Sequence, residues 1–230
     1  MEKVIRIIIR TLLLVSICLL GYFCVMSIVT PIQFEEQRAL REKAVVKRLI
    51  DIRKVEIEYK NQKGRYSANI DTLVSFIKDG KVAVVMKEGT LTDEQLKDGL
   101  TEAKATEIVR KGNKKEIESL GLQNFRRDTT YVSVYESLFK KDYTFENVAS
   151  IFEIPYSNGK KFAIDTITFT NASGIAMPLF EAKAAYETYL EDLNRQELVN
   201  LIDTKNKLDK YAGLQVGSIV EPNNNAGNWE

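Results

Sequence analysis

The sequence contains no histidine, and its only cysteines are Cys18 and Cys24. Histidine is the commonest general base and transition-metal ligand near neutral pH, so its absence removes the usual centre of both chemistries. Two cysteines within one apolar run also exclude a disulfide framework and a cysteine-based zinc site. We therefore expect no cofactor and no metal, and the sequence predicts a protein that is not an enzyme.

Charge of one sign is also scarce, because the 230 residues carry a net charge of only +1. The basic stripe that nucleic-acid binding requires is missing, so we expect no nucleic-acid partner. A composition with 44% hydrophobic and 28% charged residues is instead typical of a folded protein.

Two charged clusters were considered as sites. Carboxylates follow one another at Glu191, Asp192 and Glu197, and paired carboxylates can act as acid and base. At this density of acidic residues, we interpret them as a chance cluster. Arg126 and Arg127 are followed by Asp128 before a predicted strand and could bind an anion, but a surface ion pair is the preferred interpretation.

The N-terminal region contains one long apolar run, residues 11–29, without a charge. At 1.5 Å per residue it spans about 28 Å, close to the hydrocarbon thickness of a bilayer. It is longer than the apolar core of a cleaved signal peptide, which is the alternative. We therefore predict a retained single-pass membrane helix that contacts lipid. The run is preceded by the basic residues Lys3, Arg6 and Arg10. This charge predicts that the N-terminus lies in the cytoplasm and the rest of the chain in the periplasm.

A long amphipathic helix is predicted after Pro31, which we expect to end the membrane helix. From Phe34 to Lys60 apolar residues recur every three or four positions, as on a helix with one buried face. We expect this protruding helix, residues 31–66, to pack partly on its own sheet and partly on a partner. The stripe consists of Leu40, Ala44, Val45, Leu49, Ile52, Val55 and Tyr59.

The predicted partner-binding residues are Leu40, Val45, Leu49 and Ile52 of this stripe, together with Trp229. Trp229 is the only tryptophan and lies in a polar C-terminal tail. A solitary tryptophan there is a candidate anchor for a partner, and an irregular chain end is the alternative.

Capping signals divide the following segment. Gly64 fits a helix C-terminus, and Tyr66 is expected to fold back on that helix. Asn69 fits the N-cap of a short helix over residues 70–77, and residues 81–86 predict a strand. Within the polar helical insert, residues 89–121, the expected caps and stops are Thr92 with Gln95, Thr101, Gly112, Asn113 and Gly121.

From Arg126 the apolar pattern alternates, which predicts four or five antiparallel strands within residues 129–139, 145–156, 160–173 and 174–190. A helix from Asn194 to Lys205 and a closing strand over residues 214–220 follow. The sequence thus predicts an α+β fold, with a long helix packed on an antiparallel sheet. The predicted segments are the cytoplasmic start and membrane helix 1–30, the protruding helix 31–66, the globular domain 67–222 with its insert 89–121, and the polar tail 223–230.

This order of elements resembles that of type IV pilins and type II secretion pseudopilins. The residues that carry the resemblance form the stretch RLIDIRKVEIEYKNQKGRYSANIDTLVSFI, residues 48–77. The family also has a Gly-Phe processing site before the apolar run and a glutamate five residues into it. Here Gly21-Tyr22-Phe23 lies within the run, and Met26 stands at the glutamate position. The matching positions are Tyr59, Gly64, Arg65, Tyr66, Ser67, Asp71 and Leu73.

The resemblance implies a non-enzymatic, single-span subunit of a bacterial envelope assembly, such as a pilus-like, secretion or envelope motor complex. Its periplasmic domain would make protein–protein contacts with other envelope proteins, and a homo-oligomer is left open. The alternative is a membrane-tethered periplasmic module that binds a ligand or acts as a sensor, with its pocket between the sheet and the insert.

Overall fold

The computed structural model describes residues 2–230, apart from the side chains of residues 2–4, 84–87 and 128–129. The described chain is α+β, with a long apolar N-terminal helix and antiparallel sheets, as the sequence predicted. It divides into two compact units. The first unit comprises residues 1–74 and 149–230, and the second comprises residues 75–148.

The first unit is built on one continuous helix, α1 (Glu2–Lys63). The expectation that Pro31 ends the membrane helix is wrong, because Pro31 lies inside α1. A proline in a helix removes one backbone donor, here the bond to the Ser27 carbonyl, and its fixed φ is helical. Helices in apolar surroundings tolerate that loss when neighbouring turns remain bonded.

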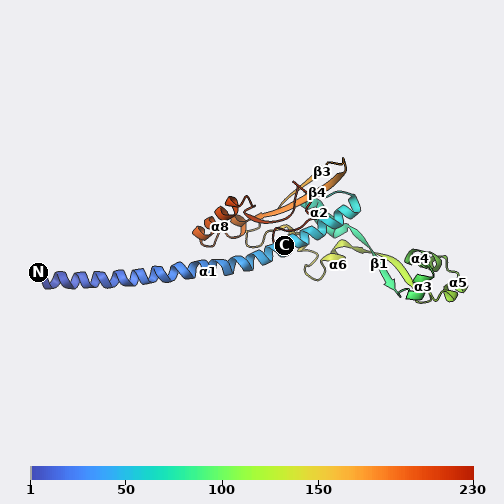
Figure 1. Cartoon of the computed structure of the whole chain (residues 1–230), viewed down its shortest axis with the longest axis horizontal. Helices are drawn as coiled ribbons and strands as arrows, with labels where there is room; N and C mark the ends of the chain where they lie inside the picture. The colour runs from blue at the N-terminus through green and yellow to red at the C-terminus, as the bar shows by residue number, and fades with distance from the viewer. Residues whose placement is uncertain (1) are drawn as a thin grey trace. The chain divides into compact units, whose positions relative to one another are not determined.

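A three-stranded antiparallel sheet covers the C-terminal half of α1. Its strands, in the spatial order β3-β4-β5, are β3 (Ala163–Thr170), β4 (Ala176–Ala185) and β5 (Gly213–Gly217). Helix α1 contacts β4 and β5 (Figure 1). The predicted packing of the long helix on an antiparallel sheet is therefore present within this unit. Its fully buried side chains include Val45, Leu49, Ile52, Val55, Phe180, Ala182 and Val216.

Two short helices and a one-turn element complete this unit. Helix α7 (Tyr186–Tyr189) follows β4, and α8 (Arg195–Lys207) begins at the predicted cap, where the Asn194 side chain accepts from the Glu197 amide at 3.1 Å. The strand expected over residues 145–156 is wrong. That segment contains the 3₁₀ helix η1 (Val148–Phe152), followed by an isolated β-bridge between Glu153 and Lys161.

The closing strand is shorter than predicted, and the polar tail is ordered against it. Strand β5 ends at Gly217, whose φ is +74°, before the predicted end at residue 220. The Gly217 amide donates to the Ala226 carbonyl at 3.0 Å, and Val216 forms a β-bridge with Gly227. The tail thus adds backbone hydrogen bonds to the edge of the sheet.

The end of α1 follows its predicted signals. Gly64 has a φ of +73°, and its amide donates to the Lys60 carbonyl at 2.7 Å. Tyr66 folds back as expected: its ring is buried, 4.8 Å from the ring of Phe180 in β4, and the Lys60 ammonium lies 5.0 Å from the Tyr66 ring. Asn69 then caps α2 (Ile70–Asp79) by accepting from the Thr72 amide at 3.1 Å.

The second unit contains a two-stranded antiparallel ribbon. The predicted strand is confirmed as β1 (Lys81–Glu88), and it pairs with β2 (Arg126–Ser133). The alternating pattern through residue 139 does not continue as a strand. Ser133 accepts from the Glu136 amide at 3.1 Å and so caps helix α6 (Val134–Leu138). The strands therefore form two separate sheets rather than one.

The insert beyond this ribbon folds into α3 (Asp93–Lys97), α4 (Glu102–Lys111) and α5 (Lys114–Ser119). The Thr92–Gln95 capping box, the Thr101 cap and the left-handed Gly112 are confirmed. Asn113 occupies the N-cap position of α5 but makes no side-chain cap bond. A small core of Ala105, Leu122 and Phe125 packs against residues of α4 and α5, and Gln95 of α3 donates to the Leu120 carbonyl at 2.7 Å.

Candidate functional site

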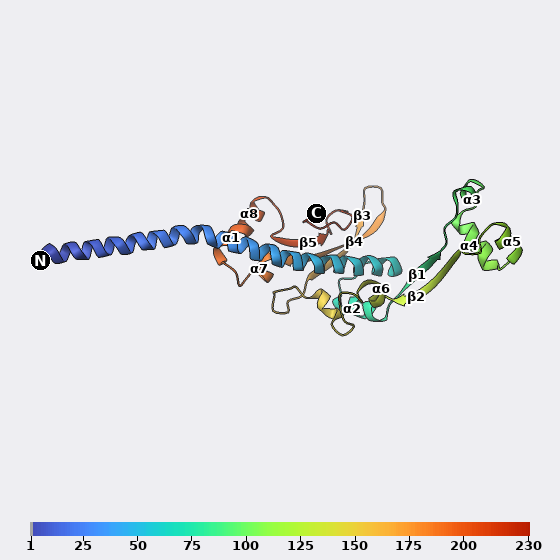
Figure 2. The ribbon, with the colours of Figure 1, turned by 90° about the horizontal axis from the view of Figure 1, so that it is seen from below.

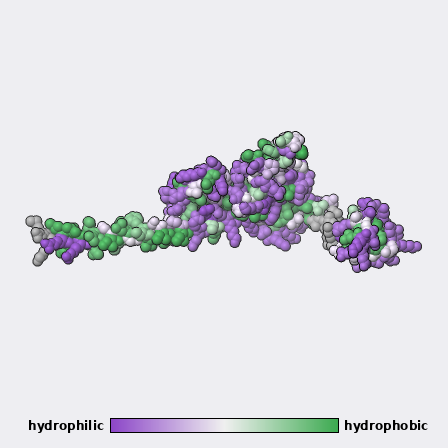
Figure 3. Space-filling view, viewed as in Figure 1, coloured by the Kyte–Doolittle hydropathy of each residue, from purple (hydrophilic) through white to green (hydrophobic). Residues whose placement is uncertain are grey.

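The N-terminal half of α1 is an exposed apolar helix. An 18-residue window of it has a mean hydropathy of 2.6, and none of that window is buried. By length and composition, this helix is sufficient to cross a membrane, consistent with a membrane anchor. Cys18 and Cys24 lie there as exposed free thiols. Figure 3 shows its apolar surface, and Figure 2 shows it running beyond the other elements of its unit.

The structure separates the predicted partner-binding residues. Val45, Leu49 and Ile52 are completely buried within the first unit, because the sheet covers the apolar stripe. Leu40 is 55% exposed, and Trp229 is half-buried with its indole against Gly227. Of the five, Leu40 and in part Trp229 are therefore accessible to a partner.

Arg41 is the first of three buried polar residues on α1. Its guanidinium pairs with both carboxylate oxygens of Asp192, with one Nη2–Oδ2 distance of 2.7 Å. Nη1 also donates to the Tyr189 carbonyl at 2.7 Å, and the guanidinium lies 4.9 Å from the centre of the Tyr156 ring. The hydrogen bond to Arg41 lowers the pKa of the Asp192 carboxyl. Arg41 therefore fixes α1 to the segment after β4.

A cleft of about 410 Å³ opens beside this pair. Tyr156 and Asn158 enter it from a loop in which both have positive φ values, 61° and 54°. The Asp192 carboxylate in the cleft is paired with the Arg41 guanidinium. The lining residues are Arg41, Tyr156, Ser157, Asn158, Thr188, Glu191 and Asp192.

Glu56 is the second buried polar residue, and it is completely covered. Its Oε2 accepts a hydrogen bond from the Ser67 amide at 3.1 Å, whereas Oε1 is buried without a hydrogen-bond partner. Burial raises the pKa of this carboxyl to about 8, against the opposing effect of the Ser67 bond. Glu56 is therefore protonated at neutral pH and ties α1 to the segment that follows it.

Asp51 is the third buried polar residue on α1, and its carboxylate pairs with the Lys54 ammonium one turn later at 2.9 Å.

The carboxylates of the predicted acidic cluster, Glu191, Asp192 and Glu197, do not form one site. Asp192 binds Arg41, and Glu191 lies 3.4 Å from the Lys160 ammonium. Among the residues that the structure describes, no group of three or more potential ligands can hold a metal ion.

Sequence reasoning missed Arg41 and Glu56, although a signal was present. Arg41 precedes Val45 by four residues, and Glu56 follows Ile52 by four, so both continue the apolar stripe. A polar residue at a buried position of a helix must find a partner, because an unpaired buried charge is costly. The interruption of the stripe at these two positions could therefore have identified them.

Comparison with protein-family models, curated proteins and solved structures finds no match to this chain.

Proposed function

We propose that this protein is a non-enzymatic subunit of a bacterial envelope assembly, held in the inner membrane by one helix. Its N-terminus lies in the cytoplasm and the remainder of the chain in the periplasm. The observation that carries the proposal is the division of α1, a single helix whose first half is apolar and exposed and whose second half is buried on a sheet.

The exposed half of α1 requires a covering. Its apolar side chains are exposed on all faces rather than along one stripe, for example Leu12 at 66% and Leu14 at 62%. A helix lying in a membrane surface has one polar face, whereas a helix that is apolar all round belongs in a bilayer or in a helix bundle. Lipid around residues 11–29 meets this requirement.

The architecture of the first unit supports a pilin-like plan. A continuous helix that protrudes at one end and packs on an antiparallel sheet at the other is the arrangement that the resemblance implied. Met26 replaces the glutamate of the pilin family. Our proposal therefore includes neither peptidase processing nor polymerisation through the membrane helix.

The cleft at Arg41 favours the alternative function, a membrane-tethered ligand-binding or sensor module. Its volume of about 410 Å³ is within the range of small-molecule pockets. The Arg41 guanidinium in this cleft is already paired with Asp192. A ligand would therefore have to bind through Tyr156, Ser157 and Asn158 or displace the ion pair. We regard the subunit role as the better supported one.

Site-specific photo-crosslinking tests the subunit role. A photoreactive phenylalanine analogue at Leu40, which is exposed, should give a crosslinked product of higher mass in native membranes. The same analogue at Ile175, an exposed residue of the β3–β4 turn, is the control. Purification after mild detergent extraction should recover the same partner. A strictly monomeric protein with no product from Leu40 would contradict the proposal.

A further inference from the structure

The second unit contains a pocket of about 340 Å³ between α4 and the start of β2. Three of its five lining residues are arginines. Among the described residues, none that lines the pocket is acidic. The lining residues are Thr106, Val109, Arg110, Arg126 and Arg127.

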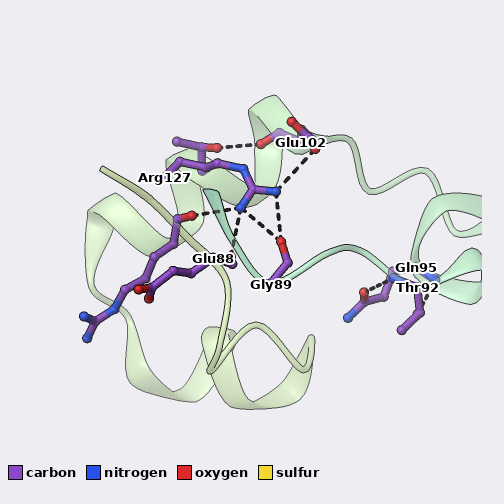
Figure 4. Close-up of polar contacts among 8 residues, drawn as sticks. Glu88, Gly89, Thr92, Gln95, Glu102 and Arg127 are labelled. Atoms are coloured by element: carbon purple, nitrogen blue, oxygen red, sulfur yellow. Dashed lines mark hydrogen bonds and ion pairs between the residues drawn. The ribbon is translucent and has the colours of Figure 1, made fainter. Parts of the chain in front are cut away.

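Arg127 is held in place by its two terminal nitrogens. Nη1 donates to the carbonyls of Glu88 and Arg126, each at 2.8 Å, and to that of Gly89 at 3.1 Å. Nη2 donates to the Gly89 carbonyl at 3.1 Å and to the Glu102 carboxylate at 3.3 Å (Figure 4). The guanidinium is therefore fixed before any ligand binds.

One N–H donor of this fixed guanidinium has no hydrogen-bond acceptor. The Arg127 side chain is only 6% exposed, and its Nε is buried without a hydrogen-bond partner. Most buried donors are satisfied by protein or water, and an unsatisfied one costs about 1–3 kcal/mol. The guanidinium also lies 4.0 Å from the centre of the Phe125 ring, which restricts its rotation further. Nε itself is covered by protein atoms, so the contribution of Arg127 to the pocket is the positive charge of a fixed guanidinium in its lining.

The other two arginines supply mobile positive charge. Arg110 and Arg126 are exposed, and neither has a hydrogen bond or ion pair through its side chain to any described residue. The acidic residue one turn before Arg110 is Glu107, which already pairs with Lys111 at 2.9 Å. Arg110 interacts electrostatically with Glu107, but the guanidinium groups of Arg110 and Arg126 are not fixed by a hydrogen bond to any described residue.

We propose that this pocket binds the phosphate group of a small molecule, with Arg110 and Arg126 closing on its oxygens and the fixed guanidinium of Arg127 forming part of the pocket wall. Guanidinium groups match the planar, two-oxygen geometry that phosphate presents, and charge-assisted bonds to them are among the strongest in proteins. The volume is at the lower end of small-molecule pockets, which fits free phosphate or a small phosphate ester.

From the sequence we interpret Arg126 and Arg127 as members of a surface ion pair, and the proposed phosphate site revises that interpretation. Arg127 does pair with Glu102, but its side chain is buried, and Arg126 remains without such a partner among the described residues. The phosphate site lies within the second unit, so it does not depend on the proposed role of α1 as a membrane anchor.

Equilibrium dialysis of the full chain in detergent micelles against radiolabelled phosphate tests the proposal. We expect saturable binding that competes with unlabelled phosphate and not with chloride at equal ionic strength. Arg110→Gln and Arg126→Gln should each weaken binding about tenfold, because each removes one charge-assisted contact. Lys115→Gln removes one exposed charge from the neighbouring helix α5 and should leave binding unchanged.

Competition with glycerol 3-phosphate separates the two sources of the phosphate group. Tighter binding of the ester indicates a phosphorylated small molecule, and tighter binding of free phosphate indicates the ion itself. Either result supports the site. Absence of saturable binding, or equal weakening by Lys115→Gln, would overturn it. As a second measurement, the Nε–H resonances of Arg110 and Arg126 should shift on saturation with phosphate, and resonances that do not move would also overturn the proposal.

Discussion

Glu56 is a carboxyl group that folding places out of contact with water on the buried face of α1. Its pKa rises from the ordinary value of 4.5 to about 8. The folded state therefore holds this proton more tightly than the unfolded state does. Glu56 contributes its full stabilisation below pH 4.5, and this contribution is lost as the pH rises towards about 8.

We therefore predict that the thermal unfolding midpoint of the full chain in micelles decreases as the pH is raised from 5 to 8. The slope due to Glu56 is at most about 1.4 kcal/mol per pH unit. Glu56→Gln is neutral at every pH and keeps an acceptor for the Ser67 amide, so it should remove that slope. Circular dichroism at a series of pH values measures it. Glu36→Gln, an exposed change on the same helix, should retain the wild-type slope, and an unchanged slope in Glu56→Gln would contradict the assignment.

At the scale of elements, β5 and the C-terminal tail depend on the backbone of Gly217. Its φ of +74° is a conformation that L side chains rarely adopt, and a Cβ there would lie 2.2 Å from the Phe180 carbonyl oxygen of β4. Gly174, in the β3–β4 turn, has a similar φ of +77° but has no atom within 4 Å of such a Cβ. The two glycines therefore share the conformation and differ in the space around them.

Gly217→Ala should destabilise the chain by about 1–3 kcal/mol more than Gly174→Ala. Both substitutions carry the cost of a left-handed residue, about 1–2 kcal/mol, so their difference isolates the contact with β4. Thermal unfolding in micelles measures both. Equal destabilisation by the two variants would show that the close approach of β4 does not constrain this position.

The parts of the fold that could be predicted from sequence are those specified locally. Asn69, Thr92 and Asn194 each lie next to the amide that they cap, so residue type and spacing are sufficient. The alternation of residues 145–156 was ambiguous, because short apolar runs fit strands and helical turns alike. Pro31 was misread because its own residue type favours a break, whereas the surrounding turns continue the helix.

The polar contacts could not be predicted in the same way. Arg41 and Asp192 are separated by 151 residues, and no local pattern relates them. The pocket around Arg127 likewise depends on the insert helices packing beside β2. Arg126 and Arg127 were visible as a basic pair, but the buried Nε of Arg127 depends on carbonyls at Glu88 and Gly89 that only the ribbon brings close.

For the whole molecule, the central claim is that α1 crosses the membrane once and carries the described units on the periplasmic side. Because α1 is one uninterrupted helix, its apolar half and its sheet-packed half belong to the same rigid element. On the proposed topology, the sheet of the first unit lies close to the membrane surface, and the exposed Leu40 of α1 is the proposed contact with another subunit.

Cysteine accessibility tests this claim most directly. In a Cys18→Ser, Cys24→Ser background, single cysteines are placed at Ser173, in the exposed β3–β4 turn, and at Arg6, before the apolar run. The protein should stay in the membrane pellet after alkaline carbonate extraction. In intact spheroplasts, an impermeant maleimide should label position 173, whereas position 6 should be labelled only after permeabilisation. Release by carbonate, or protection of position 173 in intact spheroplasts, would contradict the account.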